Sequence, residues 1–90
     1  MRDVIDATIV FIKALNLTEA SVEIEQRLGH GDKYTFKIGD QSICAEIFFE
    51  YVRLDTGTDV IYEKDYLAAK DLFAMRIFRN ILAYISNEHA

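Results

Sequence analysis

The sequence predicts a two-layer α+β sandwich, in which a twisted antiparallel sheet carries both helices on one face. Apolar residues recur at helical spacing near both ends of the chain, whereas the middle alternates apolar and polar residues with the period of two that strands have. Short turns containing glycine separate the strand-like segments. These observations give the element order α-β-β-β-(β)-α, and a length of 90 residues indicates a single domain, 1–90.

The composition is typical of a folded, soluble protein inside the cell. Apolar residues make up 51% of the chain, and no apolar run approaches the roughly 20 residues that a membrane-spanning helix needs. The lone cysteine, Cys44, excludes an internal disulfide, and the first residues include Asp3 and Asp6 where a signal peptide would carry positive charge. We therefore expect a cytoplasmic protein that binds no membrane.

The first helix is expected to begin at Asp3, whose carboxylate suits a capping position, and to stop at Asn16. Its apolar residues recur at helical spacing and are Val4, Ile5, Ile9, Phe11, Ile12 and Leu15. Because they lie on more than one side of the helix, contact with the sheet alone would not cover them all.

From Ala20 the apolar period changes to two, which predicts a strand with one solvent-facing side. The segment Gly29-His30-Gly31 suits a three-residue hairpin loop with glycine in its last position. The resulting cross-strand pairs are Val22–Ile38, Ile24–Phe36 and Glu23–Lys37.

A second turn follows at Gly39-Asp40, which is short enough for a two-residue hairpin. The predicted pairs of this hairpin are Phe36–Ile43, Tyr34–Ala45, Thr35–Cys44 and Lys33–Glu46. The second strand ends near Asp32, opposite Ile47. A third strand that continued to Leu54 would therefore leave backbone groups unpaired along one edge.

The stretch 42–54 is expected to be one long strand whose unpaired part needs a partner. The partner can come from within the chain, if residues 58–62 return as a fourth strand after a turn at 55–57, with Arg53 opposite Asp59. It can also be a symmetry mate in a homodimer, or a strand from a different protein. A helix over 43–54 fits the apolar spacing too, but the β-branched and aromatic content favours a strand.

The last helix is expected to run from Asp65, a suitable capping residue, to about Asn87. Its apolar side chains cover roughly 200° of the helix circumference, whereas a helix that rests on one surface needs little more than ~100°. The remaining polar strip consists of Arg76, Arg79, Asn80 and Asn87. The second apolar contact is therefore with the first helix or with another subunit.

The sequence contains no recognisable constellation of catalytic, cofactor-binding or metal-binding residues. Cys44 falls in mid-strand with no histidine nearby, which is typical of a packed residue rather than a nucleophile. Glu46 and Glu50, four residues apart on a strand, would be separated by about 13 Å, too far to act as a catalytic pair. We therefore expect a protein that is not an enzyme and carries no cofactor.

The net charge of −5 is concentrated between residues 40 and 65, where seven acidic residues stand against two basic ones. This distribution argues against direct binding of nucleic acid, which requires clustered Lys and Arg. It favours a basic protein as a partner.

The leading hypothesis is a non-enzymatic protein-interaction module, a homodimer that associates through the strand 42–54 and the C-terminal helix. A second hypothesis is an acidic inhibitor or decoy whose segment 40–65 binds a basic, nucleic-acid-handling protein. A third is a small ligand-binding protein or enzyme with no visible motif. The residues expected to form the interaction surfaces are Cys44, Glu46, Phe48, Glu50, Val52, Asp55, Asp59, Phe78, Ile81 and Ile85. Among them, Cys44, Phe48 and Val52 are expected to form an apolar strip on the outer face of the sheet.

Overall fold

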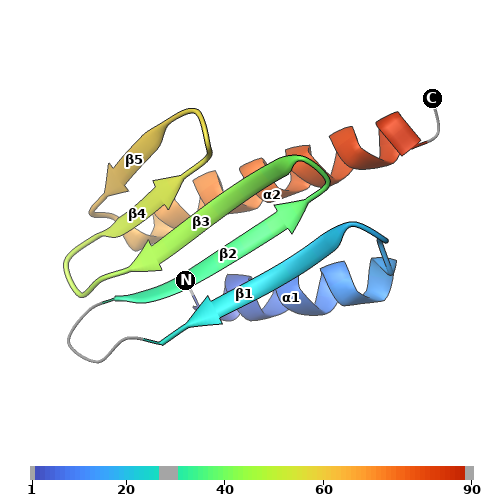
Figure 1. The fold of residues 1–90 in the computed structure, drawn as a ribbon. Coiled ribbons are helices and arrows are strands. Elements are labelled where there is room, and N and C mark those ends of the chain that lie inside the picture. The colour runs from blue at the N-terminus through green and yellow to red at the C-terminus, as the bar shows by residue number, and fades with distance from the viewer. Residues whose placement is uncertain (1, 27–30, 89–90) are drawn as a thin grey trace.

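The computed structural model describes residues 2–26 and 31–88, which form two helices and five strands. The elements are α1 (Arg2–Leu15), β1 (Ala20–Glu25), β2 (Asp32–Ile38), β3 (Gln41–Ile47), β4 (Val52–Asp55), β5 (Val60–Glu63) and α2 (Tyr66–Glu88). The strands form an antiparallel sheet in the order β1-β2-β3-β4-β5, and both helices lie on one side of it (Figure 1). The predicted α+β fold is confirmed, and the sheet has five strands where three or four were expected.

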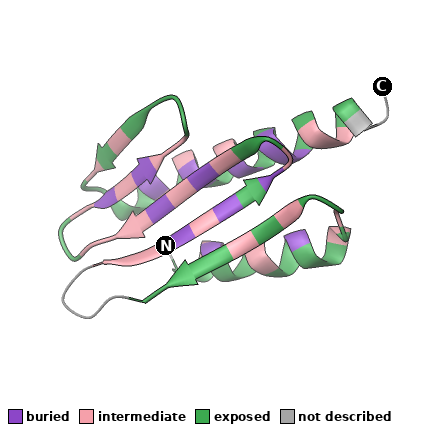
Figure 2. Cartoon of the chain, in the orientation of Figure 1, coloured by how far each residue is buried: buried purple, intermediate pink, exposed green. Residues whose placement is uncertain are grey.

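The hydrophobic core lies between the sheet and the helices. Figure 2 shows that the buried positions of the sheet are concentrated in its central strands β2, β3 and β4. Helix α2 packs against these strands, and the ring of Phe73 lies 5.3 Å from that of Phe36 on β2, centroid to centroid. Helix α1 contributes Ile5 and Ile12 to the same buried cluster. The period of two along each strand thus places one face of the sheet in the core and leaves the other exposed.

Helix α1 begins one residue earlier than predicted, so Asp3 lies in its first turn rather than at the capping position. The carboxylate of Asp3 instead accepts a hydrogen bond from Nζ of Lys70 on α2, at 3.0 Å. The predicted stop is correct. Asn16 has a φ of 51°, and its N–H donates to the carbonyl of Lys13 at 3.2 Å, which ends the helix with a left-handed residue.

The register predicted for the first hairpin is wrong by two residues. Val22 lies opposite Phe36 instead of Ile38. Gly29 and His30 lie outside the described residues. A slip of two leaves every side chain on its predicted face, because successive strand residues alternate sides. Glu23 still reaches Lys37, now along a diagonal, at 3.8 Å.

The second hairpin is as predicted, with all four expected pairs between β2 and β3. Gly39 adopts a φ of +62°, a left-handed conformation that glycine accepts without steric penalty. Its N–H donates to the carbonyl of Glu19 at 2.8 Å, which ties this turn to the start of β1. The two-residue turn fixes the register of the pair that forms the centre of the sheet.

The single long strand predicted over 42–54 is wrong, and so is the helix considered over 43–54. Strand β3 ends at Ile47, the chain reverses through residues 48–51, and β4 begins at Val52, directly opposite Ile47. The N–H of Phe48 donates to the carbonyl of Tyr51 at 2.9 Å, and their rings stack with centroids 4.8 Å apart. The overshooting residues therefore find their partner within the same chain.

The fourth strand that was expected over 58–62 exists as β5, but its predicted register is wrong. Arg53 lies opposite Tyr62 instead of Asp59. The turn is longer than three residues, because the N–H of Thr56 donates to the carbonyl of Asp59 at 2.9 Å. The side chain of Asp55 accepts the N–H of Gly57 at 2.9 Å and stabilises this four-residue turn. Strand β3 consequently has a neighbour on each side, and the edges of the sheet are β1 and β5.

Helix α2 begins as predicted, because the carboxylate of Asp65 accepts the N–H of Leu67 at 2.9 Å. Its predicted polar strip is only partly exposed: Asn80 is buried, and Arg76 is half-buried. Among the described residues, neither helix combines the length and the apolar character that a membrane span requires.

Candidate functional site

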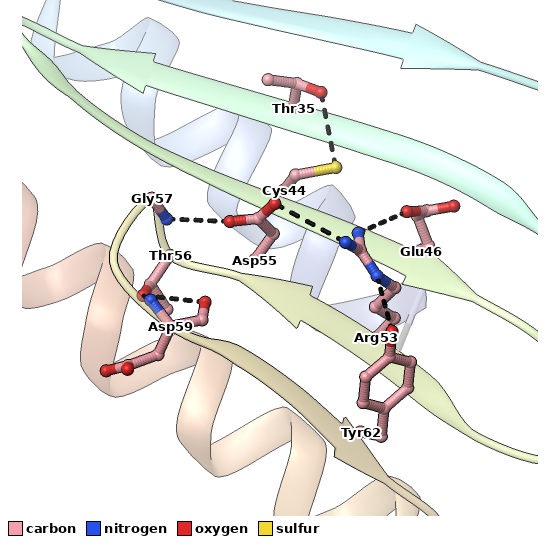
Figure 3. Close-up of polar contacts among 9 residues, drawn as sticks. All are labelled: Thr35, Cys44, Glu46, Arg53, Asp55, Thr56, Gly57, Asp59 and Tyr62. Carbon is pink, nitrogen blue, oxygen red and sulfur yellow. Dashed lines mark hydrogen bonds and ion pairs between the residues drawn. The ribbon is translucent and has the colours of Figure 1, made fainter.

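The outer face of the sheet carries a row of charged and polar side chains that runs across adjacent strands. Glu46 on β3 lies opposite Arg53 on β4, which lies opposite Tyr62 on β5. Figure 3 shows the guanidinium of Arg53 between the carboxylates of Glu46 and Asp55, with the hydroxyl of Tyr62 below it. Side chains from three strands thus meet at one basic group.

Arg53 is held by contacts with three side chains. Its Nη1 lies 2.8 Å from Oε1 of Glu46, its Nη2 lies 3.8 Å from Oδ2 of Asp55, and its Nε donates to Tyr62 at 3.4 Å. The hydrogen bond with Tyr62 and the attraction of Glu46 raise the pKa of Arg53 above its usual value, against the opposing effect of burial. Only 12% of the Glu46 side chain and 27% of the Arg53 side chain are exposed. The charges of Glu46 and Arg53 are therefore paired with each other and largely shielded from solvent.

Cys44 lies beside this cluster, between Thr35 on β2 and Asp55 on β4. The hydroxyl of Thr35 donates to its sulfur at 3.7 Å, and the thiol is free and half-buried. Nucleophilic cysteines are activated by a nearby cation or a helix N-terminus, and Thr35 and Asp55 supply neither. Across residues 2–26 and 31–88, no group of three His, Cys, Asp or Glu side chains is arranged to hold a metal ion.

The apolar strip predicted on the outer face is not formed. Val52 is fully buried on the core side, because the reversal at 48–51 changes which strand residues face the core. Phe48 is half-buried against Tyr51 in the turn, and Glu50 is exposed there. Phe49, which sequence reasoning passed over, is 96% exposed. The position predicted for Val52 is therefore wrong, and at the reversal it is Phe49 rather than Phe48 that presents its ring to solvent.

The turn at 48–51 is anchored from helix α2. The hydroxyl of Tyr66 lies 2.5 Å from the carbonyl of Phe48 and 2.7 Å from that of Phe49. This contact joins the first turn of α2 to a reversal that contains neither glycine nor proline.

Several acids of the 40–65 segment have partners within the chain. Besides Glu46 and Asp55, Glu63 accepts the N–H of Asp65 at 3.1 Å, and Asp65 caps α2. The exposed acids of the segment include Glu50 and Asp59. The segment therefore presents fewer uncommitted carboxylates than its sequence suggests.

The helices present much of the exposed apolar surface. Leu67 and Met75 of α2 are each 70% exposed, and Phe78 is 58% exposed. We call the following six exposed side chains the helical face: Val10, Phe11, Leu67, Met75, Phe78 and Leu82. Of the three helix residues predicted to interact, Phe78 belongs to this face. Ile81 is buried in the core and Ile85 packs half-buried against it, so neither presents the surface that was expected.

A groove between the two helices connects the two halves of the helical face. Its lining consists of Val4, Ala7, Thr8 and Phe11 from α1 and Ala74, Ile77, Phe78 and Ile81 from α2. None of these side chains is charged. The rings of Phe11 and Phe78 border the groove from opposite helices, so the apolar surface continues from one helix to the other.

A second hollow lies on the other flank of α2, against β3 and the β4–β5 hairpin. It has a volume of about 180 Å³ and is lined by Ile43, Leu54, Thr56, Asp59, Ile61, Leu72, Met75, Arg76 and Arg79. Nε of Arg76 is buried there and has no hydrogen-bond partner among the described residues. Sequence reasoning missed this site, because its lining comes from four separate elements and the turn at 56–59.

Comparison with protein-family models, with curated proteins and with solved structures found no match for this chain.

Proposed function

We propose that this protein is a non-enzymatic interaction module that acts as a homodimer, and that two copies associate through the helical face. The observation that carries the proposal is the exposure of six large apolar side chains on the two helices. On α2 the residues Leu67, Met75, Phe78 and Leu82 recur at intervals that return to one side of a helix. A helix normally turns such a side toward a protein surface.

The size of this face suits a second copy of the chain. Six side chains of this kind, exposed by about half or more, offer on the order of 600 Å² of apolar surface, at the upper end for the largest patch on a monomer. A stable interface buries roughly 800 Å² on each partner, including its polar rim. A two-fold dimer presents the same surface twice, so one apolar patch supplies both sides of the interface.

The surface proposed here differs from the one that the sequence suggested. The stretch 42–54 was expected to offer an unpaired strand edge, but β3 is paired on both sides and β4 pairs with β5. The other predicted surface, on the C-terminal helix, remains part of the proposal. The apolar residues of the two helices exceed what one sheet face and the neighbouring helix cover. The free thiol of Cys44 is in keeping with the reducing environment of the cytoplasm, where we place this dimer.

A second candidate function, an acidic decoy for a basic protein, has weaker support. A decoy needs carboxylates that are free to contact the partner, whereas Glu46 is bound to Arg53 and Asp65 caps a helix. We therefore rank it below the dimer.

The proposal is tested by sedimentation equilibrium on the wild-type protein and on two matched variants. Phe78→Ser removes a ring from the centre of the helical face, whereas Phe49→Ser removes an even more exposed ring from the turn at 48–51. We expect Phe78→Ser to weaken the dimer at least about tenfold, because central aromatic residues dominate interface energies. Phe49→Ser should leave the dissociation constant unchanged. A dimer weakened by Phe49→Ser and unaffected by Phe78→Ser would contradict the assignment of the surface.

A further inference from the structure

We propose that the hollow between α2 and the β4–β5 hairpin is a binding site for small carboxylic acids with an apolar body. The apolar part of the lining comes from Ile43, Leu54 and Ile61 on three strands and from Leu72 and Met75 on α2. Ile43 and Leu54 are almost fully buried, so they form a fixed floor. A site of this kind, with an apolar floor and a few converging polar groups, is typical of small-molecule sites.

The size of the hollow limits its ligand. Its volume of about 180 Å³ is close to the ~150 Å³ of an apolar cavity that accommodates benzene. The ligand's apolar part is therefore of the size of one aromatic ring or a short branched chain. Longer chains, such as those of fatty acids, would extend into solvent.

Two guanidinium groups supply the preference for an anion. Arg76 and Arg79 stand three positions apart on α2, so they lie on the same side of the helix and both line the hollow. The Nε of Arg76 is closed to solvent and has no partner among the described residues, so a ligand in the hollow can meet this side chain only through the rest of its guanidinium. A carboxylate is the acceptor that fits a guanidinium best, because its two oxygens match two parallel N–H groups.

One acid opposes this preference. Asp59 also lines the hollow, from the turn between β4 and β5, and its charge repels an anion. With two arginines and one aspartate, the charged side chains of the lining sum to +1. Removing the charge of Asp59 should therefore strengthen the binding of a carboxylate, whereas removing either arginine should weaken it.

The test is a titration followed by ¹⁵N-resolved NMR, with benzoate, phenylacetate and 4-methylpentanoate as probes and phenylacetamide as the uncharged match of phenylacetate. At least one acid should produce saturable shifts in the amides of the lining, including those of Ile61, Leu72 and Arg79. The dissociation constant should rise at least about tenfold in Arg76→Gln or Arg79→Gln, because a charge-assisted pair is lost. It should fall in Asp59→Asn.

Arg2→Gln is the matched control, because Arg2 pairs with Asp32 away from this hollow, and its loss changes the net charge equally. That variant should bind as the wild type does. The proposal is overturned if none of the three acids gives saturable shifts up to its solubility limit, or if phenylacetamide binds as well as phenylacetate. It is equally overturned if Arg79→Gln binds as the wild type does. Arg79 is exposed, so its contribution does not involve the buried Nε of Arg76.

Discussion

The ion pair between Glu46 and Arg53 should contribute measurably to stability. The size of this contribution shows whether Glu46 serves the fold or is available to a basic partner, as the decoy hypothesis requires. If Glu46 is a structural partner of Arg53, it is not available to a basic protein. We therefore consider a double-mutant cycle built from Glu46→Gln, Arg53→Gln and the double variant. The cycle isolates the energy of the pair from the other effects of each substitution.

The magnitude follows from the burial of the pair. Exposed ion pairs contribute about 0.2–1 kcal/mol, whereas removing one partner of a fully buried pair costs about 3–5 kcal/mol. The side chains of Glu46 and Arg53 are 12% and 27% exposed and 2.8 Å apart, which places them between these limits. We expect a coupling energy of about 1–2 kcal/mol, and Arg53→Gln alone should lower Tm by roughly 5–15 °C in a domain of this size.

The assay is urea denaturation of the four proteins at low and at high salt. The pair of Lys37 and Glu23 serves as a control, because its atoms are 3.8 Å apart and both side chains are more than half exposed. Its coupling should be near the ~0.5 kcal/mol of surface pairs and should vanish in salt. A coupling between Glu46 and Arg53 below about 0.3 kcal/mol, the usual error of additivity, would refute the reasoning that Glu46 is a structural partner of Arg53.

Two further predictions concern contacts between elements. Tyr66→Phe should destabilise the fold by about 0.5–1.5 kcal/mol and speed hydrogen exchange at the Phe48 amide, because the hydroxyl that anchors the 48–51 turn is lost; unchanged exchange there would contradict the anchoring role. The hydrogen bond from Lys70 lowers the pKa of Asp3 from 3.8 to about 2. Because the folded-state pKa is lowered, the stabilisation from Asp3 is complete above pH 3.8 and is lost as the pH falls through about 2. As the pH falls from 3.8 to about 2, Asp3→Asn should therefore lose less stability than the wild type. Acid titrations followed by circular dichroism measure this difference, and parallel curves for the two proteins would count against the pair of Asp3 and Lys70.

The sequence allowed the central hairpin to be predicted in full and the first hairpin only in part. The two-residue turn at Gly39-Asp40 fixes the pairing of β2 with β3. In the first hairpin the alternation of apolar residues is unchanged by a slip of two, so only the position and length of the turn determine the register. The observed pair of Val22 with Phe36 keeps the same alternation as the predicted pair with Ile38.

The reversal at 48–51 was not predicted because the residues of this segment favour a continuous strand. Phe48, Phe49 and Tyr51 favour strands, and the segment has no glycine or proline to indicate a turn. The turn is stabilised by tertiary contacts, among them the hydroxyl of Tyr66, which is distant in sequence. Contacts of this kind leave no trace in a pattern of propensities.

The candidate interaction surfaces, too, could be predicted only in part from the sequence. The excess apolar circumference of the last helix was visible in its sequence, but which side chains stay exposed depends on the position of α1. Ile81 faces the core, whereas Phe78, three residues earlier, is exposed beside the groove between the helices. The hollow lined by Arg76 and Arg79 requires the β4–β5 hairpin, whose register the sequence did not determine.

The most direct test of the proposed dimer is the mass of the wild-type protein in solution, measured by light scattering after size exclusion from low to high micromolar concentration. The chain has a mass of 10.4 kDa, and the helical face predicts a species of twice this mass that persists on dilution. A mass of 10.4 kDa at every concentration would contradict the proposal that the helical face is covered by a second copy of the chain.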